Sequence, residues 1–169
     1  LRAEKRFRVY GIAALMLAVM VLVGVLGTLT QRGYTGFMQT RITLPITFDA
    51  ETIGLEPGGD IATLSVSGFN RLAQLAIKNQ FPDAKDVNQQ RLLRNIISGN
   101  NGRHIKDYLI ANPCALSTTV ELPVVASSNV DLYSKGETDS SNTQLNEEQL
   151  RWLTALQQQG RVSTAFNTA

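Results

Sequence analysis

The stretch VYGIAALMLAVMVLVGVLGTLTQ, residues 9–31, contains no charged side chain, and Arg8 and Arg32 flank it. A helix of about 23 residues is about 34 Å long, which is enough to cross a hydrocarbon layer of about 30 Å. No helical face of this run is polar, so the run lacks the pattern of a helix that lies on a membrane surface. The stretch therefore predicts a transmembrane helix at residues 9–31.

The charge before this helix predicts its orientation. Residues 1–8 carry Arg2, Lys5, Arg6 and Arg8 against the single acid Glu4, a net charge of +3 in a chain whose total is +2. Basic residues beside a membrane segment favour the cytoplasmic side. We expect a cytoplasmic tail at residues 1–8 and the remaining chain outside the cytoplasm. A cleaved signal peptide is the weaker alternative. The apolar core of a signal peptide has about 7–15 residues, which is shorter than this run, and the sequence lacks an Ala-x-Ala cleavage site.

The chain after the helix is long enough for one domain with a core. We expect a membrane-proximal linker at residues 32–40, an α+β domain at residues 41–161 and a connector without regular structure at residues 162–169. Residues 41–48, RITLPITF, alternate apolar and polar side chains and predict a strand. Because Pro45 cannot donate to a ladder, it is expected in an edge strand or at a strand end, and Pro123 suggests an edge position for a second strand at residues 118–126. The two strands are expected to pair under a cover of helices.

Helical periodicity recurs between and after these strands. It predicts about four helices, at residues 67–80, 86–98, 104–111 and 147–159, and a short helical or turn segment at 127–136. Ser67 is the expected N-cap of the first helix, and Asn146 with Gln149 forms a capping box on the last. Glycines at 99 and 102 are expected to end the second helix, which includes Val87 in its buried face, with left-handed geometry. The predicted core is Ile42, Leu44, Ile46, Phe69, Leu72, Ile96, Val120, Leu122, Leu153 and Leu156.

No catalytic motif is present, so no enzyme, metal or cofactor is expected, and no substrate-binding residue is assigned. Cys114 is the only cysteine and is expected to be a packed apolar side chain. His104 is the only histidine, which is too few for a metal site, and is expected at the surface. The arginines are spread over several elements away from glycine nests and helix N-termini, so tight phosphate binding is not expected. These arginines are Arg41, Arg71, Arg91, Arg94 and Arg103.

Four ordered stretches resemble a known family. They are AEKRFRVYG at 3–11, QTRITLPITFD at 39–49, VDLYSKG at 130–136, and residues 145–161 followed by FNTA at 166–169. Together they resemble the N-terminal module of the PstA-type permease subunit of bacterial phosphate ABC importers. In that family the module is a domain of unknown function, with a first transmembrane helix and a periplasmic insertion.

The resemblance implies phosphate uptake across the bacterial inner membrane. The implied partners are membrane lipid, a second permease subunit, ATPase subunits that drive transport and a periplasmic phosphate-binding protein, with no nucleic acid. In that family further membrane helices, with the translocation path and the coupling loop, follow this module, so neither is assigned to residues of this sequence. The expected role is assembly or docking of the phosphate-binding protein. The alternative is a single-pass envelope scaffold or sensor that recruits a protein partner.

Overall fold

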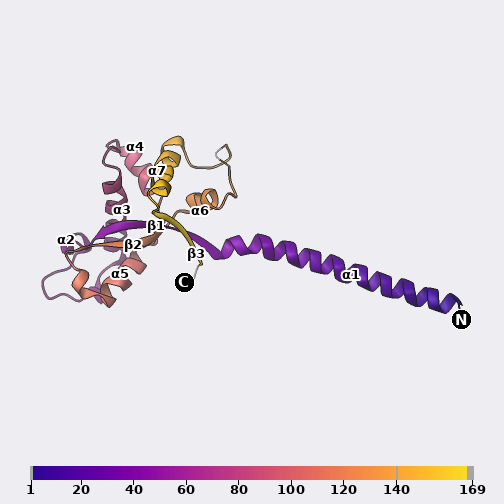
Figure 1. Ribbon diagram of the computed structural model, residues 1–169. Coiled ribbons are helices and arrows are strands. Elements are labelled where there is room, and N and C mark those ends of the chain that lie inside the picture. Colours follow the sequence, from indigo (N-terminus) through magenta and orange to yellow (C-terminus); the bar gives the residue numbers. More distant parts are fainter. Residues whose placement is uncertain (1, 140, 167–169) are drawn as a thin grey trace. The chain divides into compact units, whose positions relative to one another are not determined.

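The computed structural model describes residues 2–139 and 141–166, and the chain divides into two units, Leu1–Met38 and Gln39–Ala169 (Figure 1). The first unit contains the helix α1, Arg2–Tyr34, and a 3-10 helix at Thr35–Phe37. Within α1, the 25 residues Arg6–Thr30 are long and apolar enough to cross a membrane. The predicted apolar helix is therefore present, and α1 continues beyond residues 9–31 at both ends.

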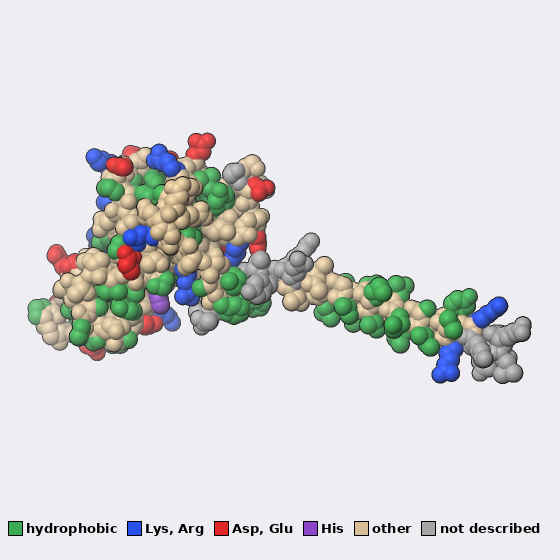
Figure 2. All heavy atoms as spheres, in the orientation of Figure 1, with side chains coloured by type: hydrophobic (Ala, Val, Ile, Leu, Met, Phe, Trp, Pro, Cys, Tyr) green, Lys and Arg blue, Asp and Glu red, His purple; other side chains and the backbone are tan. Residues whose placement is uncertain are grey.

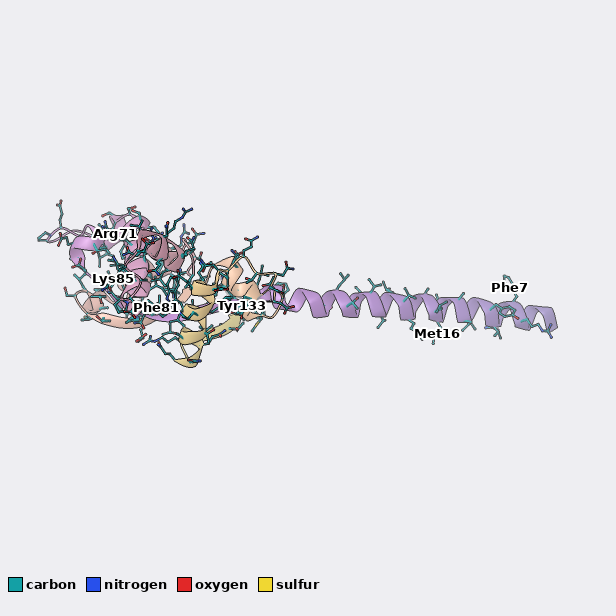
Figure 3. The ribbon with its side chains drawn as sticks, turned by 90° about the horizontal axis from the view of Figure 1, so that it is seen from above. Phe7, Met16, Arg71, Phe81, Lys85 and Tyr133 are labelled. Atoms are coloured by element: carbon teal, nitrogen blue, oxygen red, sulfur yellow. The ribbon has the colours of Figure 1, made fainter. Side chains whose placement is uncertain are left out.

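The surface of α1 suits a hydrocarbon environment. Apolar side chains run along its length, and basic side chains gather at one end (Figure 2). Phe7 is 82% exposed and Met16 is 65% exposed, and both project outward from the helix (Figure 3). The hydroxyls of Thr28 and Thr30 donate to carbonyl oxygens one turn earlier in the helix, the second to Leu26 O at 2.8 Å. These hydroxyls are thus satisfied within α1, as a lipid environment requires.

Residues 32–40 do not form the expected linker. Helix α1 runs to Tyr34, the 3-10 helix follows, and strand β1 begins at Met38. Thr40 is fully buried, and its amide donates to Asp131 Oδ1 at 2.7 Å. The strand therefore starts earlier than its alternation indicates, and a distant side chain holds its first residues in place.

The second unit is built on a three-stranded sheet with the order β2-β1-β3. Its strands are β1, Met38–Thr47, β2, Thr119–Val125, and β3, Val162–Phe166. Strands β1 and β2 pair antiparallel, with Ile42 opposite Val124 and Leu44 opposite Leu122. This confirms the predicted pairing, and β2, which contains Pro123, is an edge strand as predicted. The core face of β1 and the residue after it is fully buried: Ile42, Leu44, Ile46 and Phe48.

Strand β1 is central in the sheet rather than at an edge, but Pro45 lies near its C-terminal end, which is the other position that the sequence allowed. Residues 162–166, predicted as a connector, form a strand; residues 167–169 lie outside the described residues. Thr43 N donates to Arg161 O at 2.8 Å, and β3 runs back toward the start of β1 (Figure 1). The backbone nitrogen of Pro45, two residues after Thr43, faces the same side of β1 as Thr43 N. It lies beyond the part of β1 that β3 covers. A proline is tolerated there because no β3 carbonyl needs its missing N–H.

Six α-helices follow or separate the strands in the described part of this unit. They are α2, Ala50–Ile53, α3, Val66–Gln80, α4, Val87–Arg94, α5, Gly102–Ala111, α6, Ser128–Ser134, and α7, Glu147–Gln158. The N-cap of α3 is Ser65, not Ser67, since Ser65 Oγ accepts from Ser67 N at 3.3 Å. The predicted capping box of α7 is confirmed: Gln149 N donates to Asn146 Oδ1 at 2.9 Å, and Asn146 N to Gln149 Oε1 at 3.2 Å.

Helix α4 ends four residues earlier than predicted because the chain joins the sheet. Ser98 N donates to Val125 O at 2.9 Å, and Ile97 forms a bridge with Ala126. Gly99 and Gly102 do not have positive φ, so the predicted left-handed end is wrong. Val87, predicted inside, is 78% exposed at the first turn of α4.

The core confirms the α+β class. Nine of the ten predicted core residues are buried, and only Val120 is partly exposed. The rings of Phe48 and Tyr108 stack with centroids 6.0 Å apart, which joins the end of β1 to α5. Helix α3 packs against α2, α4 and α5, so its outer side remains free for contact with solvent or a partner.

Candidate docking surface

Charge is unevenly distributed over the second unit. Residues 66–94, which contain α3, α4 and their connection, carry five basic side chains against Asp83 and Asp86. The remaining residues between 39 and 169 carry six basic and eleven acidic side chains. The basic residues of α3, α4 and the connection are Arg71, Lys78, Lys85, Arg91 and Arg94. One pair of helices is therefore basic in a domain that is otherwise acidic.

The helical periodicity of α3 places part of this charge on one side of the helix. Arg71, Leu75 and Lys78 are spaced by four and three residues, so they share one side of the helix. All three are exposed, whereas the opposite side of α3 is buried in the core through Phe69, Leu72, Ala73, Ala76 and Ile77. Arg71 and Lys85 lie at the same end of the domain (Figure 3).

Three shallow hollows connect these cations. Arg91 and Arg94 line a hollow of about 270 Å³ with Asn70 and Gln74. A second, of about 170 Å³, shares Gln74 and Arg94 with the first and adds Lys78. A third, of about 500 Å³, shares Lys78 with the second and extends to Lys85. We call this continuous surface the α3–α4 face, defined by Arg71, Gln74, Lys78, Lys85, Arg91 and Arg94.

The cations of the α3–α4 face form no ion pair with a carboxylate of the described residues. Among residues 2–139 and 141–166, ion pairs join Lys135 to Asp131 and Arg161 to Glu121, and neither pair belongs to this face. Asp86 Oδ2 accepts from Asn88 N at 3.0 Å and caps α4, and Asp83 lines none of the three hollows. Uncompensated charges at close spacing maintain a positive potential, which favours an acidic surface as a partner.

The structure places the five singled-out arginines around separate hollows. Arg91 and Arg94 share a hollow on α4, and Arg41 and Arg103 line a different cavity with His104. Arg103 also lies in the first turn of α5, so the prediction that no arginine adjoins a helix N-terminus is wrong. The signal for the α3–α4 face was present in the sequence, because neither α3 nor α4 contains an acidic residue.

Two other singled-out residues are at the surface. His104 is exposed on α5, as predicted. Cys114 is also exposed, so its predicted packing is wrong. It lies in the 3-10 helix Pro113–Ala115, which turns Ala115 rather than the thiol into the core. Within the described residues, no three His, Cys, Asp or Glu side chains are grouped as metal ligands.

Comparison with known proteins adds a family without an assigned activity. A family described as "Domain of unknown function (DUF3333)" matches residues 1–144. No curated protein and no solved structure matches the chain. The matched region contains α1, the paired strands β1 and β2, and the whole α3–α4 face. The apolar helix and the α3–α4 face of this chain thus both lie within the matched segment, and the chain belongs to the DUF3333 family.

Proposed function

We propose that this chain is a membrane-anchored docking module. Helix α1 anchors it in the bacterial inner membrane with a cytoplasmic N-terminus, and the α+β domain lies in the periplasm. The α3–α4 face binds an acidic surface of a protein partner. In line with the PstA-type resemblance, the partner is the phosphate-binding protein or the second permease subunit of a phosphate ABC importer. A separate ATPase subunit drives transport, so the chain itself is not an enzyme.

The observation that carries this proposal is the set of unpaired cations on two well-packed helices. The backbones of α3, α4 and their connection place these charges on one continuous side of the domain, which favours attraction of a partner to that side. Long-range attraction raises the rate of encounter with an acidic partner. Leu75, which is 39% exposed between Arg71 and Lys78, supplies an apolar contact once water is excluded. An anchor in the membrane also raises the local concentration of the domain near its partner.

A protein surface fits this face better than a lipid headgroup layer does. Amide side chains of Asn70, Gln74, Gln90 and Asn95 stand between the cations and line the same hollows. Amides donate and accept hydrogen bonds in fixed directions, which suits a folded partner with matching groups. Binding to anionic lipid is an alternative outcome of the test below.

The test reverses charge on the α3–α4 face of the full chain in nanodiscs of neutral lipid. The double variant Arg91→Glu/Arg94→Glu should bind the phosphate-binding protein or the second permease subunit at least about tenfold more weakly. The affinity of the unaltered chain should fall as salt concentration rises, because solvent-exposed charges are screened. Arg151→Glu is the matched control, since Arg151 is an exposed cation on α7 that lines none of the three hollows.

Two results would overturn the docking proposal. The first is equal affinity of the double variant and the unaltered chain for both importer partners. The second is loss of binding to anionic vesicles in the double variant while protein binding is retained. Face-dependent binding to an envelope protein outside the importer would instead support the scaffold or sensor alternative.

A further inference from the structure

A second cavity, separate from the α3–α4 face, lies between the sheet and the start of α5. It has a volume of about 350 Å³ and is lined by Arg41 of β1, Pro123 of β2, and Arg103, His104 and Asp107 of α5. Arg41 alternates with the buried residues of β1, so it lies on the face of the sheet opposite the core. The fold thereby places two guanidinium groups, 62 residues apart in sequence, around one concavity.

The guanidinium group of Arg41 has an unused donor. Its Nε atom is buried from solvent and has no hydrogen-bond partner among the described residues. Neither Arg41 nor Arg103 forms an ion pair with a described carboxylate. A buried donor without an acceptor is costly, and the cost is larger for a charged group.

The start of α5 supplies further donors. Its N-cap residue Asn101 does not cap the helix, because its side chain bonds to Ser98 O at 2.8 Å and to both backbone groups of Val125. The amide of Gly102 donates to Asn70 Oδ1 at 2.5 Å. The amides of Arg103 and His104 have no acceptor in the described part of the chain. Free amides in a first helical turn favour negative charge.

We propose that this cavity binds a small free oxoanion, with sulfate and inorganic phosphate as probes. The two guanidinium groups and the two amides offer the charge-assisted donors that such an anion accepts. Asp107, one turn after Arg103, opposes binding on its own side, so the anion sits between Arg41 and the first turn of α5. The proposal does not depend on docking through the α3–α4 face.

The test titrates sulfate and phosphate into the full chain in a neutral detergent, with chloride used to hold ionic strength constant. Binding should saturate, and the amide resonances of Arg103 and His104 should shift most. Arg41→Gln and Arg103→Gln should each weaken binding about tenfold or more. Arg103 is exposed, so its variant keeps the test valid if Arg41→Gln fails to fold. Arg151→Gln should bind like the unaltered chain.

The absence of saturation, or equal binding by both cavity variants and the control, would overturn the proposal. Loss of sulfate binding in Arg91→Glu/Arg94→Glu with retention in Arg103→Gln would also overturn it, because the ion would then sit on the α3–α4 face. Retention in Arg91→Glu/Arg94→Glu with loss in Arg103→Gln supports the cavity, whatever the outcome of the docking experiment.

Discussion

Gly102 sets how closely α3 and α5 approach each other. A Cβ atom at this position would overlap Val66 O and would lie 2.9 Å from Asn70 Cγ, both on α3. The amide of Gly102 also donates to Asn70 Oδ1. The two helices therefore meet through backbone, and any side chain at residue 102 forces them apart.

Gly102→Ala is expected to destabilise the domain by about 1–3 kcal/mol, because overpacking shifts well-packed helices. Denaturant unfolding of the full chain in detergent, followed by Trp152 fluorescence, measures this change. Gly99→Ala is the matched control, since a Cβ at residue 99 would meet nothing within 4 Å. Equal stability of the two variants would show that α3 and α5 have room to spare.

Asp131 holds the start of the central strand. Its Oδ1 accepts from Thr40 N at 2.7 Å, and its Oδ2 accepts from Lys135 Nζ at 2.6 Å. Burial raises the pKa of Asp131, but the hydrogen bonds from Lys135 and Thr40 and the charge of Lys135 lower it more. The net result is a pKa below the ordinary value for aspartate, so folding favours the ionised carboxylate.

This lowered pKa predicts a pH-dependent contribution to stability. The contribution is present above the unfolded pKa of about 3.9 and is lost as pH falls through the lower folded pKa. Asp131→Asn should therefore cost about 1 kcal/mol at neutral pH, and the difference should shrink as pH falls below about 4. Thermal unfolding from pH 7 to pH 3 measures it, with Asp83→Asn as an exposed control. A difference that stays constant down to pH 3 would contradict the role of the charge.

At the scale of elements, one buried glutamine joins α7 to α4. Gln149 is 5% exposed, and its Nε2 donates to Leu92 O at 2.8 Å in the last turn of α4. Its Oε1 accepts from the amide of Asn146 and completes the capping box of α7. A single side chain thus satisfies backbone groups at the end of one helix and the start of another.

Gln149→Ala should lower the free energy of unfolding by about 1–3 kcal/mol, because the Leu92 carbonyl and the Asn146 amide both lose a partner. Chemical denaturation gives the value. Gln157→Ala on the exposed side of α7 is the control and should change stability little. If both variants unfold alike, water replaces the glutamine at both sites.

The elements that the sequence predicted well are those whose signals are local. The apolar face of α3 and the alternation of β1 depend on neighbours three, four or two residues away, and the structure buries the same residues. The end of α4 and the strand β3 depend instead on distant hydrogen bonds, from Ser98 N to Val125 O and from Thr43 N to Arg161 O. Such partners follow from the assembled sheet and leave no periodic pattern in sequence.

At the scale of the whole molecule, the same limit applies to candidate sites. The charge of the α3–α4 face could be predicted, because its residues are close in sequence. The cavity of Arg41 and Arg103 could not, since β1 and α5 are brought together only when the core forms. Asn101 illustrates the point: it is the N-cap residue of α5, but its side chain bonds to Val125 of β2, which is distant in sequence.

The proposed orientation of the whole chain can be measured with reporter fusions. A reporter active only in the periplasm should be active when fused after Gln39 and after Thr143, because the basic tail keeps the N-terminus in the cytoplasm. Exchange of the basic residues at positions 2, 5, 6 and 8 for glutamate should reduce that activity. Activity of a cytoplasm-only reporter at both fusion sites would sink the proposed topology.

Because β3 returns along β1, the domain begins and ends on neighbouring strands. The chain enters at Gln39, traverses the helices and comes back beside the strand on which it began. Domains whose two ends meet can be spliced into a loop of another protein, or cut out of it, without re-threading the host chain. Residues 39–166 can therefore be transplanted as one continuous piece, because their first and last strands are neighbours in the sheet.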